Sequence, residues 1–161
     1  IRGMEGDDVL TDSPGDDLLL GGPGNDTLTG GAGNDIYRYD GLGRDVIINN
    51  GGGLDGIDFS ERRLTIDNLK FHRERDDLVI VVDYGMAPKI RVSNHFAAGE
   101  SAIGFIRVSE GTATQDYSAM QIAERLHPLP PLRNVEDILI KGDEEAQRAM
   151  TEIIQFYELN V

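Results

Sequence analysis

The sequence has no cysteine and no tryptophan among its 161 residues. Without cysteine, disulfide bonds and thiolate metal ligands are excluded. No run of 18 apolar residues occurs, so we expect no transmembrane segment. The first residues also lack the basic region and apolar core of a secretory signal peptide. Because the sequence begins at Ile1 and not at a methionine, we expect it to be part of a longer protein.

The motifs of the common enzyme classes are also missing. The sequence contains no GxSxG nucleophile elbow and no GxxxxGK[ST] phosphate-binding loop. The three histidines, His72, His95 and His127, match no zinc-ligand spacing. Residues 51–56 fit GxGxxG, but no helix pattern follows them, which favours a structural turn over a dinucleotide site. We therefore expect no active site, and so no enzyme, in this chain itself.

Basic side chains are few. The chain has 29 Asp and Glu against 15 Lys and Arg, and residues 1–58 alone carry twelve acidic and three basic side chains. This excess of negative charge argues against nucleic acid and anionic membrane surfaces as partners. Cations are the expected partners of residues 1–58.

Glycine, in contrast, is abundant, and in residues 3–58 it follows a period of nine. Six units cover this stretch, with one-residue insertions at Tyr39 and Asn49. The units begin at Gly3, Asp12, Gly21, Gly30, Asp40 and Asn50. Each unit has glycine at its fourth position, aspartate at its sixth and a large apolar or aromatic residue at its eighth. The eighth positions are Leu10, Leu19, Leu28, Tyr37, Ile47 and Ile57.

This pattern resembles the RTX calcium-binding nonapeptide, GGxGxDxUx, over residues 1 to about 58. The resemblance implies a right-handed parallel β-roll, in which each unit lies over the unit two places later. That stacking pairs Asp8 with Asp26, Asp17 with Asp35, Asp26 with Asp45, and Asp35 with Asp55. It implies about four calcium ions, one in each gap, held by aspartates and by backbone carbonyl oxygens of the first four positions. The residues implied at these sites are Asp8, Asp17, Asp26, Asp35, Asp45, Asp55, Gly6, Gly15, Gly22, Gly24, Gly31, Gly33, Gly41 and Gly43.

Calcium agrees with the chemistry of these residues. Hard oxygen ligands in flexible number suit Ca²⁺, whereas Mg²⁺ demands a stricter octahedron. Without a cation, the stacked aspartates repel one another. With a Kd of about 10⁻⁴ M and about 1 mM free calcium, four sites add about 6 kcal/mol, close to the stability of a small domain. We therefore expect the repeats to fold outside the cell. The alternative, a disordered acidic linker, is disfavoured because such a linker needs no apolar residue at every ninth position.

The segment after the repeats is predicted to form strands. Its β-rich runs are Leu69 to His72, Leu78 to Asp83, Lys89 to Val92 and Ile103 to Val108. This order of strands and turns is similar to the calcium-free capping segment that follows the repeats in RTX proteins of the adenylate cyclase and haemolysin type. The resemblance implies that residues 59–111 close the open end of the roll.

Two helices are predicted further on. Ser118 can cap a helix over Ala119 to Leu126, and Asp143 can cap a second one that extends to about Tyr157. In the family that the repeats resemble, the C-terminal tail carries a signal for a type I secretion channel. The sequence of this tail is compatible with that role.

The sequence therefore predicts an all-β chain with one or two short helices, in three segments: a calcium-binding β-roll over 1–58, a β-strand cap over 59–111 and a helical tail over 112–161. The expected function is non-catalytic. The domain binds calcium and folds after type I secretion, as part of a larger secreted toxin or exoprotein. Two alternatives stay open: an adhesion module for a host-cell receptor or glycan, and an accessory domain of an extracellular protease, lipase or epimerase whose active site lies upstream.

Overall fold

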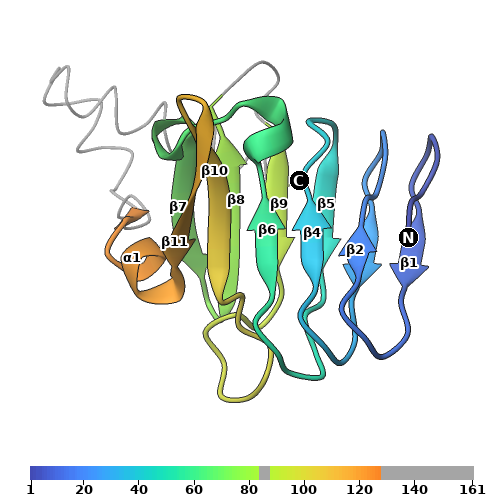
Figure 1. The fold of residues 1–161 in the computed structure, drawn as a ribbon. Helices are drawn as coiled ribbons and strands as arrows, with labels where there is room; N and C mark the ends of the chain where they lie inside the picture. Colours follow the sequence, from blue (N-terminus) through green and yellow to red (C-terminus); the bar gives the residue numbers. More distant parts are fainter. Residues whose placement is uncertain (84–87, 128–161) are drawn as a thin grey trace, which may run out of the picture. The chain divides into compact units, whose positions relative to one another are not determined.

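The computed structural model describes residues 1–83 and 88–127. Strands dominate these residues, so the prediction of an all-β fold is confirmed for this part of the chain. They form a seven-stranded sheet in the order β1-β3-β5-β9-β8-β7-β12 and a five-stranded sheet in the order β11-β10-β6-β4-β2 (Figure 1). The described part of the chain has no helix long and apolar enough to cross a membrane.

Among the described residues, the repeats supply six short strands and the following segment supplies six more. The repeat strands are β1 (Val9–Thr11), β2 (Leu18–Leu19), β3 (Thr27–Thr29), β4 (Ile36–Arg38), β5 (Arg44–Ile47) and β6 (Gly56–Asp58). The later strands are β7 (Leu69–Glu74), β8 (Asp77–Val82), β9 (Lys89–Val92), β10 (Phe105–Glu110), β11 (Ala113–Ser118) and β12 (Leu126–His127). The helical elements are the 3₁₀ turns η1 (Ser60–Arg62) and η2 (Ile66–Asn68) and the helix α1 (Ala119–Ala123).

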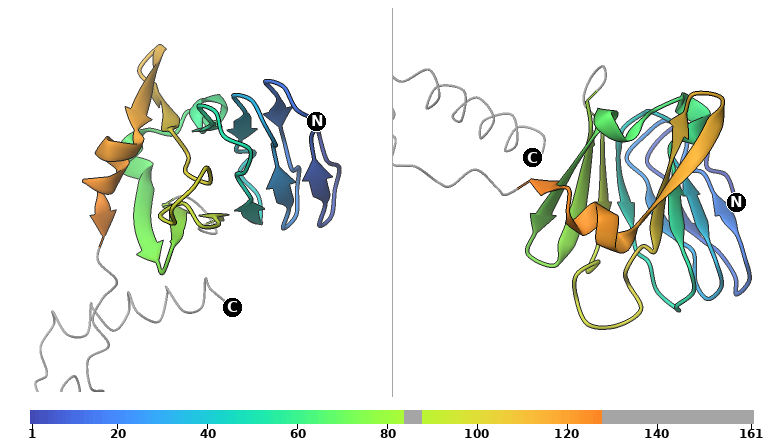
Figure 2. Two further views of the ribbon diagram at one scale, coloured as in Figure 1. Left: turned by 90° about the horizontal axis from the view of Figure 1, so that it is seen from below. Right: turned by 60° about the vertical axis from the view of Figure 1, so that its left-hand side comes forward.

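Successive repeat strands alternate between the two sheets. Strands β1, β3 and β5 pair in parallel in one sheet, and β2, β4 and β6 pair in parallel in the other, as the side views show (Figure 2). Leu10 is therefore in register with Leu28, and Tyr37 with Ile57. Each unit lies beside the unit two places later, as the resemblance to RTX repeats implied.

The eighth position of each unit faces the space between the sheets. Leu19, Tyr37 and Ile57 from one sheet and Leu28 and Ile47 from the other are at most 3 % exposed. Side chains in a strand alternate between the two faces, so one apolar residue in a three-residue strand is enough to fill a narrow core. The same core continues among the later strands, where Phe71, Ile80 and Ile106 are buried.

Both sheets become mixed after the repeats. Strand β9 pairs in parallel with β5, but β8 and β7 then add antiparallel pairs. Strand β10 pairs in parallel with β6, and β11 with β10 antiparallel. Short turns cause the reversal: Arg75 between β7 and β8, and Gly111 between β10 and β11, have φ values of 56° and 62°. The repeat strands thus pair in parallel, as expected for a β-roll, while each sheet as a whole is mixed because the later strands add antiparallel pairs.

The four strands predicted after the repeats are confirmed in β7, β8, β9 and β10. The segment assigned to a helical tail, however, begins with a strand: Ala113–Ser118 forms β11, whose residues pair with all six residues of β10. Apolar and polar residues do not alternate in β11. Such a polar strand is tolerated here, since it lies at the edge of its sheet and is mostly exposed. The division of the chain at 58/59 and 111/112 stays a prediction.

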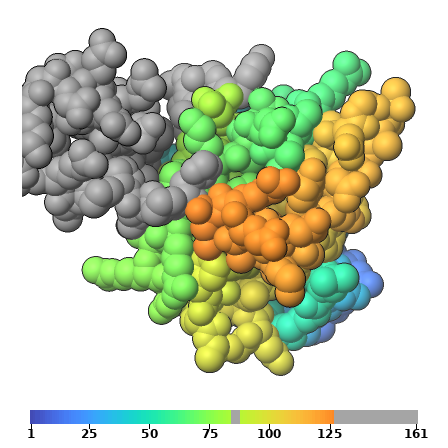
Figure 3. Space-filling model, turned by 90° about the vertical axis from the view of Figure 1, so that its left-hand side faces the viewer, coloured from blue at the N-terminus to red at the C-terminus, as the bar shows by residue number. Residues whose placement is uncertain are grey.

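The predicted helix after Ser118 is present but shorter than expected. The Ser118 hydroxyl accepts a hydrogen bond from the Gln121 N–H, and the Gln121 side chain accepts one from the Ser118 N–H. The helix ends at Ala123 and not at Leu126, because Leu126 pairs with Phe71 in β12. Figure 3 shows α1 and β11 covering the end of the described residues that faces away from the N-terminal repeats. The second predicted helix, residues 143–157, lies outside the described residues.

Candidate metal centre

The aspartates at the sixth position of the repeats form two columns, one along each row of turns. In every step of a column, the backbone N–H of one aspartate donates a hydrogen bond to Oδ1 of the aspartate two units later. The four steps are Asp8 to Asp26 (2.8 Å), Asp17 to Asp35 (3.0 Å), Asp26 to Asp45 (3.1 Å) and Asp35 to Asp55 (2.8 Å). These pairs are the four that the resemblance to RTX repeats implied, and each later carboxylate lies toward the earlier turn.

The one-residue insertions change the sequence separation of the paired aspartates but not their pairing. The first two steps join residues 18 positions apart, the third joins residues 19 apart and the fourth joins residues 20 apart. Tyr39 and Asn49 therefore bulge without moving the aspartates out of the columns. Both inserted residues are buried.

The later aspartates are removed from solvent. Asp26, Asp35 and Asp55 are at most 1 % exposed, and Asp45 is 8 % exposed. Their burial would be costly unless each carboxylate were paired or hydrogen-bonded. The backbone N–H satisfies only one of the two oxygens of each carboxylate, so the second oxygen decides whether the site is complete.

Three carboxylate oxygens of the columns are left without a partner. The Oδ2 atoms of Asp17, Asp26 and Asp35 are buried and accept no hydrogen bond. Burial raises the pKa of Asp26 and of Asp35, and neighbouring carboxylates raise it further, while the hydrogen bond from the backbone acts in the opposite direction. Burial also raises the pKa of Asp45 to about 7. A bound cation would give these oxygens a partner and would offset the repulsion between the carboxylates. These residues therefore fit a metal ion.

Glycine at the first position of the third and fourth units brings the backbone against these oxygens. A Cβ atom on Gly21 would lie 2.1 Å from Oδ2 of Asp26, and one on Gly30 would lie 2.3 Å from Oδ2 of Asp35. A side chain at either position would displace the carboxylate. The sequence analysis did not include these two glycines among the site residues, although the double glycine that opens both units is the signal for them.

The fourth-position glycines hold consecutive turns close together. A Cβ atom on Gly24 would lie 2.0 Å from the carbonyl oxygen of Gly6, and one on Gly33 would lie 2.1 Å from that of Gly15. The corresponding distance for Gly43 is 1.5 Å from the oxygen of Gly24. These three carbonyl oxygens therefore lie against the next turn, which explains the glycine at the fourth position of the third, fourth and fifth units. Gly6 and Gly15 have nothing within 4 Å of a Cβ atom, and only their positive φ values favour glycine.

The second-position glycines have three different environments. A Cβ atom on Gly22 would lie 2.2 Å from the carbonyl oxygen of Met4, as close as those at the fourth position. On Gly31 the nearest backbone oxygen would be 3.5 Å away, and on Gly41 the nearest atoms would belong to the Arg62 side chain. Of these three predicted site residues, only Gly22 is packed tightly against the turn before it.

One further carboxylate lies beside the odd-numbered column. Asp40, at the first position of the fifth unit, accepts a hydrogen bond from the Gly22 N–H at 2.7 Å and raises the pKa of Asp26 and of Asp45. Side chains alone nevertheless do not make a metal site. Within residues 1–83 and 88–127, no group of three or more His, Asp or Glu is placed to hold an ion. Backbone carbonyl oxygens would have to complete the coordination.

The fifth position forms a separate ladder on the exposed side of the turns. The side chains of Asp7, Asp16, Asn25 and Asn34 each accept a hydrogen bond from the backbone N–H at the fifth position two units later, at 2.8–2.9 Å. These oxygens have protein donors and lie at exposed positions. The fifth-position ladder therefore positions the turns without needing a cation.

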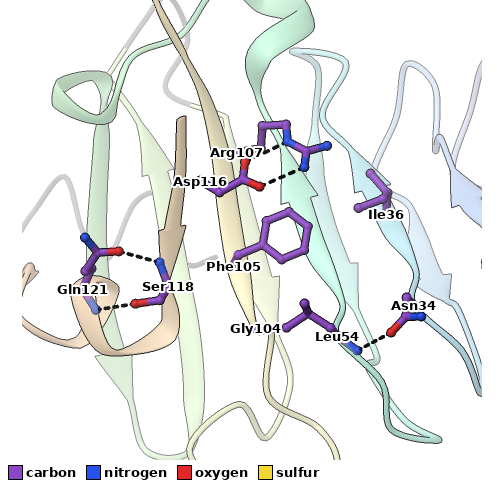
Figure 4. Close-up of a pocket in the computed structure, with 9 residues that line it drawn as sticks. All are labelled: Asn34, Ile36, Leu54, Gly104, Phe105, Arg107, Asp116, Ser118 and Gln121. Carbon is purple, nitrogen blue, oxygen red and sulfur yellow. Dashed lines mark hydrogen bonds and ion pairs between the residues drawn. The ribbon is translucent and has the colours of Figure 1, made fainter. Parts of the chain in front are cut away.

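A shallow groove of about 520 Å³ lies on the five-stranded sheet (Figure 4). Phe105 lies at its centre, with the Arg107 guanidinium 5.2 Å from the ring centroid. That guanidinium donates two hydrogen bonds of 2.8 Å to the Asp116 carboxylate. The groove is partly apolar, and its arginine is already paired.

Comparisons with known proteins agree with the geometry of the columns. Residues 2–37 match the model of the RTX calcium-binding nonapeptide repeat, in four copies. The match covers the first four units, while the fifth and sixth units and the segment after them lie outside it. A comparison with curated proteins gives no match. The similarity of residues 59–111 to the caps of adenylate cyclase and haemolysin-type proteins stays a prediction. Over residues 2–37 the chain therefore contains RTX calcium-binding nonapeptide repeats.

Proposed function

We propose that the chain is a non-catalytic domain that folds outside the cell when calcium binds between the turns of a right-handed β-roll. The observation that supports this function is the set of buried, unpartnered carboxylate oxygens on Asp17, Asp26 and Asp35. A folded chain at neutral pH and without cations keeps these oxygens desolvated next to other carboxylates. Such a state is disfavoured in proportion to the number of gaps.

The residues that would hold the ions are the aspartate columns and the glycine turns between them. Calcium would supply positive charge and six to eight oxygen-coordination positions. Asp26 and Asp35 each offer one free oxygen, Oδ2, since Oδ1 accepts a hydrogen bond from the backbone N–H of the previous turn. The fourth-position glycines fix the distance between turns, and their carbonyl oxygens face the neighbouring turn.

Calcium concentration would then control folding. The sites of extracellular calcium modules have Kd values of about 10⁻⁴ to 10⁻³ M, so they are filled outside the cell and empty in the cytosol. Binding to the folded state alone stabilises it by mass action, and the contributions of several sites add. The chain would remain unfolded before export and fold after it.

A calcium titration followed by circular dichroism tests this function. We expect a spectrum with little β-structure in chelator and a cooperative gain of β-structure at about millimolar calcium. Magnesium at the same concentration serves as the control for ionic strength and should give a smaller change. A spectrum that is β-rich in chelator and unchanged by calcium would overturn the proposal.

We further propose that the whole protein is a secreted toxin or exoprotein that leaves the cell through a type I secretion channel. RTX repeats are typical of secreted proteins. The tail that the channel would read lies within residues 128–161, outside the described residues. Export of a reporter fused to residues 128–161, compared with one fused to residues 1–127, tests the secretion signal directly.

The adhesion module is the second candidate, because the groove on the five-stranded sheet presents Phe105 and the exposed Leu54. It predicts binding of a receptor or glycan by the calcium-loaded chain, and loss of that binding on Phe105→Ala. The accessory-domain alternative predicts a catalytic domain in the sequence that precedes Ile1.

A further inference from the structure

Asp35 and Asp55 are successive members of one column and are equivalent in most respects. Both are completely buried. The Oδ1 atom of each accepts a hydrogen bond from the backbone N–H two units earlier, at 3.0 Å for Asp35 and 2.8 Å for Asp55. The difference lies in the second oxygen. Oδ2 of Asp35 has no partner, whereas Oδ2 of Asp55 accepts a hydrogen bond of 2.8 Å from Nδ2 of Asn49.

The Asn49 side chain is fixed by contacts on all sides. Its Nδ2 also donates to the carbonyl oxygen of Ala102 at 3.1 Å, and its Oδ1 accepts from the Tyr37 hydroxyl at 3.0 Å. The hydroxyl oxygen in turn accepts from the Gly30 N–H at 3.1 Å. Asn49 is 2 % exposed and Tyr37 is 1 % exposed. Every polar atom of the amide is therefore used, and its orientation is determined by its partners.

The two oxygens that Nδ2 joins are a carboxylate oxygen and a backbone carbonyl oxygen. Both kinds of oxygen are common calcium ligands in proteins. An amide nitrogen with two N–H groups can satisfy both at once without a charge. The Asn49 amide thus gives Oδ2 of Asp55 the hydrogen-bond partner that Oδ2 of Asp35 lacks.

The position of Asn49 in the chain explains why only this gap is different. Asn49 is the residue inserted between the fifth and sixth units, and no residue is inserted before the third or fourth. Ala102 belongs to the segment between β9 and β10, outside the repeats. The amide is therefore available only where the column meets the later strands.

We propose that the Asn49 amide takes the place of a calcium ion at Asp55, so that the gap between Asp35 and Asp55 binds no ion. The inference rests on the proposed function and refines it. Of the four gaps along the two columns, three bind calcium, and the fourth is closed by protein hydrogen bonds.

Two isosteric variants of the full chain test this proposal, with bound calcium counted by equilibrium dialysis at saturation. Asn49→Asp replaces the donor that faces Asp55 with a carboxylate oxygen, which recreates an unpartnered pair, so we expect one additional bound ion. Asn50→Asp adds the same charge at the exposed neighbouring residue and should add none. Equal ion counts for the two variants would overturn the proposal.

A second pair of variants tests the same gap by changing the aspartates of the column. Asp35→Asn and Asp55→Asn each keep an oxygen for the backbone N–H. We expect Asp35→Asn to lose one bound ion and Asp55→Asn to lose none. Loss of one ion from both variants would overturn the role of Asn49 while leaving the proposed function intact. A wild-type chain that binds no calcium would overturn the proposed function itself.

Discussion

Oδ1 of Asp45 accepts a hydrogen bond of 3.1 Å from the backbone N–H of Asp26, although 19 positions separate the two residues in the sequence. The same Asp26 directs its own carboxylate at the N–H of Asp8. Each internal aspartate therefore contacts the turn before it through its side chain and the turn after it through its backbone. A substitution at such a residue affects two gaps at once.

The position of an aspartate in its column predicts how much calcium binding depends on it. Asp26→Ala removes a buried carboxylate from the middle of a column, whereas Asp8→Ala removes a partly exposed one from its end. We expect the midpoint of the calcium titration to rise several-fold more for Asp26→Ala than for Asp8→Ala. Circular dichroism measures both midpoints, and equal values would contradict the stacking.

The fourth-position glycines predict a steric contrast. Gly24 and Gly6 both have positive φ values, of 152° and 112°, so alanine is strained at either position. Only a Cβ on Gly24 collides with backbone, since nothing lies within 4 Å of one on Gly6. We expect Gly6→Ala to cost about 1 kcal/mol and Gly24→Ala about 3 kcal/mol or more, by denaturant unfolding in saturating calcium. Similar losses would show that the turns are not in contact.

The fifth-position ladder predicts a small effect with no change in calcium binding. Oδ1 of Asn25 accepts a hydrogen bond from the Arg44 N–H at 2.9 Å at an exposed site. Asn25→Ala should lower the free energy of unfolding by about 0.5–1 kcal/mol and leave the number of bound ions unchanged. Loss of an ion in this variant would mean that the fifth position is also a ligand.

A buried histidine predicts a pH dependence that is separate from the repeats. Nδ1 of His95 accepts a hydrogen bond of 3.0 Å from the Ile103 N–H, and burial lowers the pKa of His95 to about 4. The unfolded chain takes up this proton at about pH 6.5, so the folded state binds fewer protons and is destabilised as the pH falls from about 6.5 to 4. This single group contributes up to about 3 kcal/mol of that loss.

The variant His95→Asn isolates this contribution, because its amide oxygen can accept the same hydrogen bond and does not titrate. We expect the free energy of unfolding in saturating calcium to fall less steeply between pH 6.5 and 4 in His95→Asn than in the wild type. The carboxylates titrate in both proteins and cancel in the comparison. Parallel curves would show that His95 is not neutral in the folded state.

The period of nine predicts much of this architecture because it is a local property of the sequence. Glycine at the fourth position, aspartate at the sixth and an apolar residue at the eighth identify the repeat. The resemblance to RTX nonapeptides then implies the stacking and the aspartate columns. The strands after the repeats follow from their β-branched residues. Each of these features depends on residues only a few positions apart.

Other features depend on contacts that no local pattern contains. Asn49 looks like an irregularity between two units until Ala102, 53 positions later, is seen beside it. Strand β11 has a polar sequence because it lies at a sheet edge, and its pairing with β10 determines its conformation. The early end of α1 follows from the pairing of Leu126 with Phe71. Tertiary contacts override local preference at all three places.

The central claim is that cations lie between the turns of the aspartate columns. The most direct measurement is the anomalous diffraction of crystals grown in excess calcium. The account predicts ions about 2.3–2.6 Å from carboxylate oxygens of Asp26 and Asp35. The same stacked turns without a cation at these oxygens would contradict it.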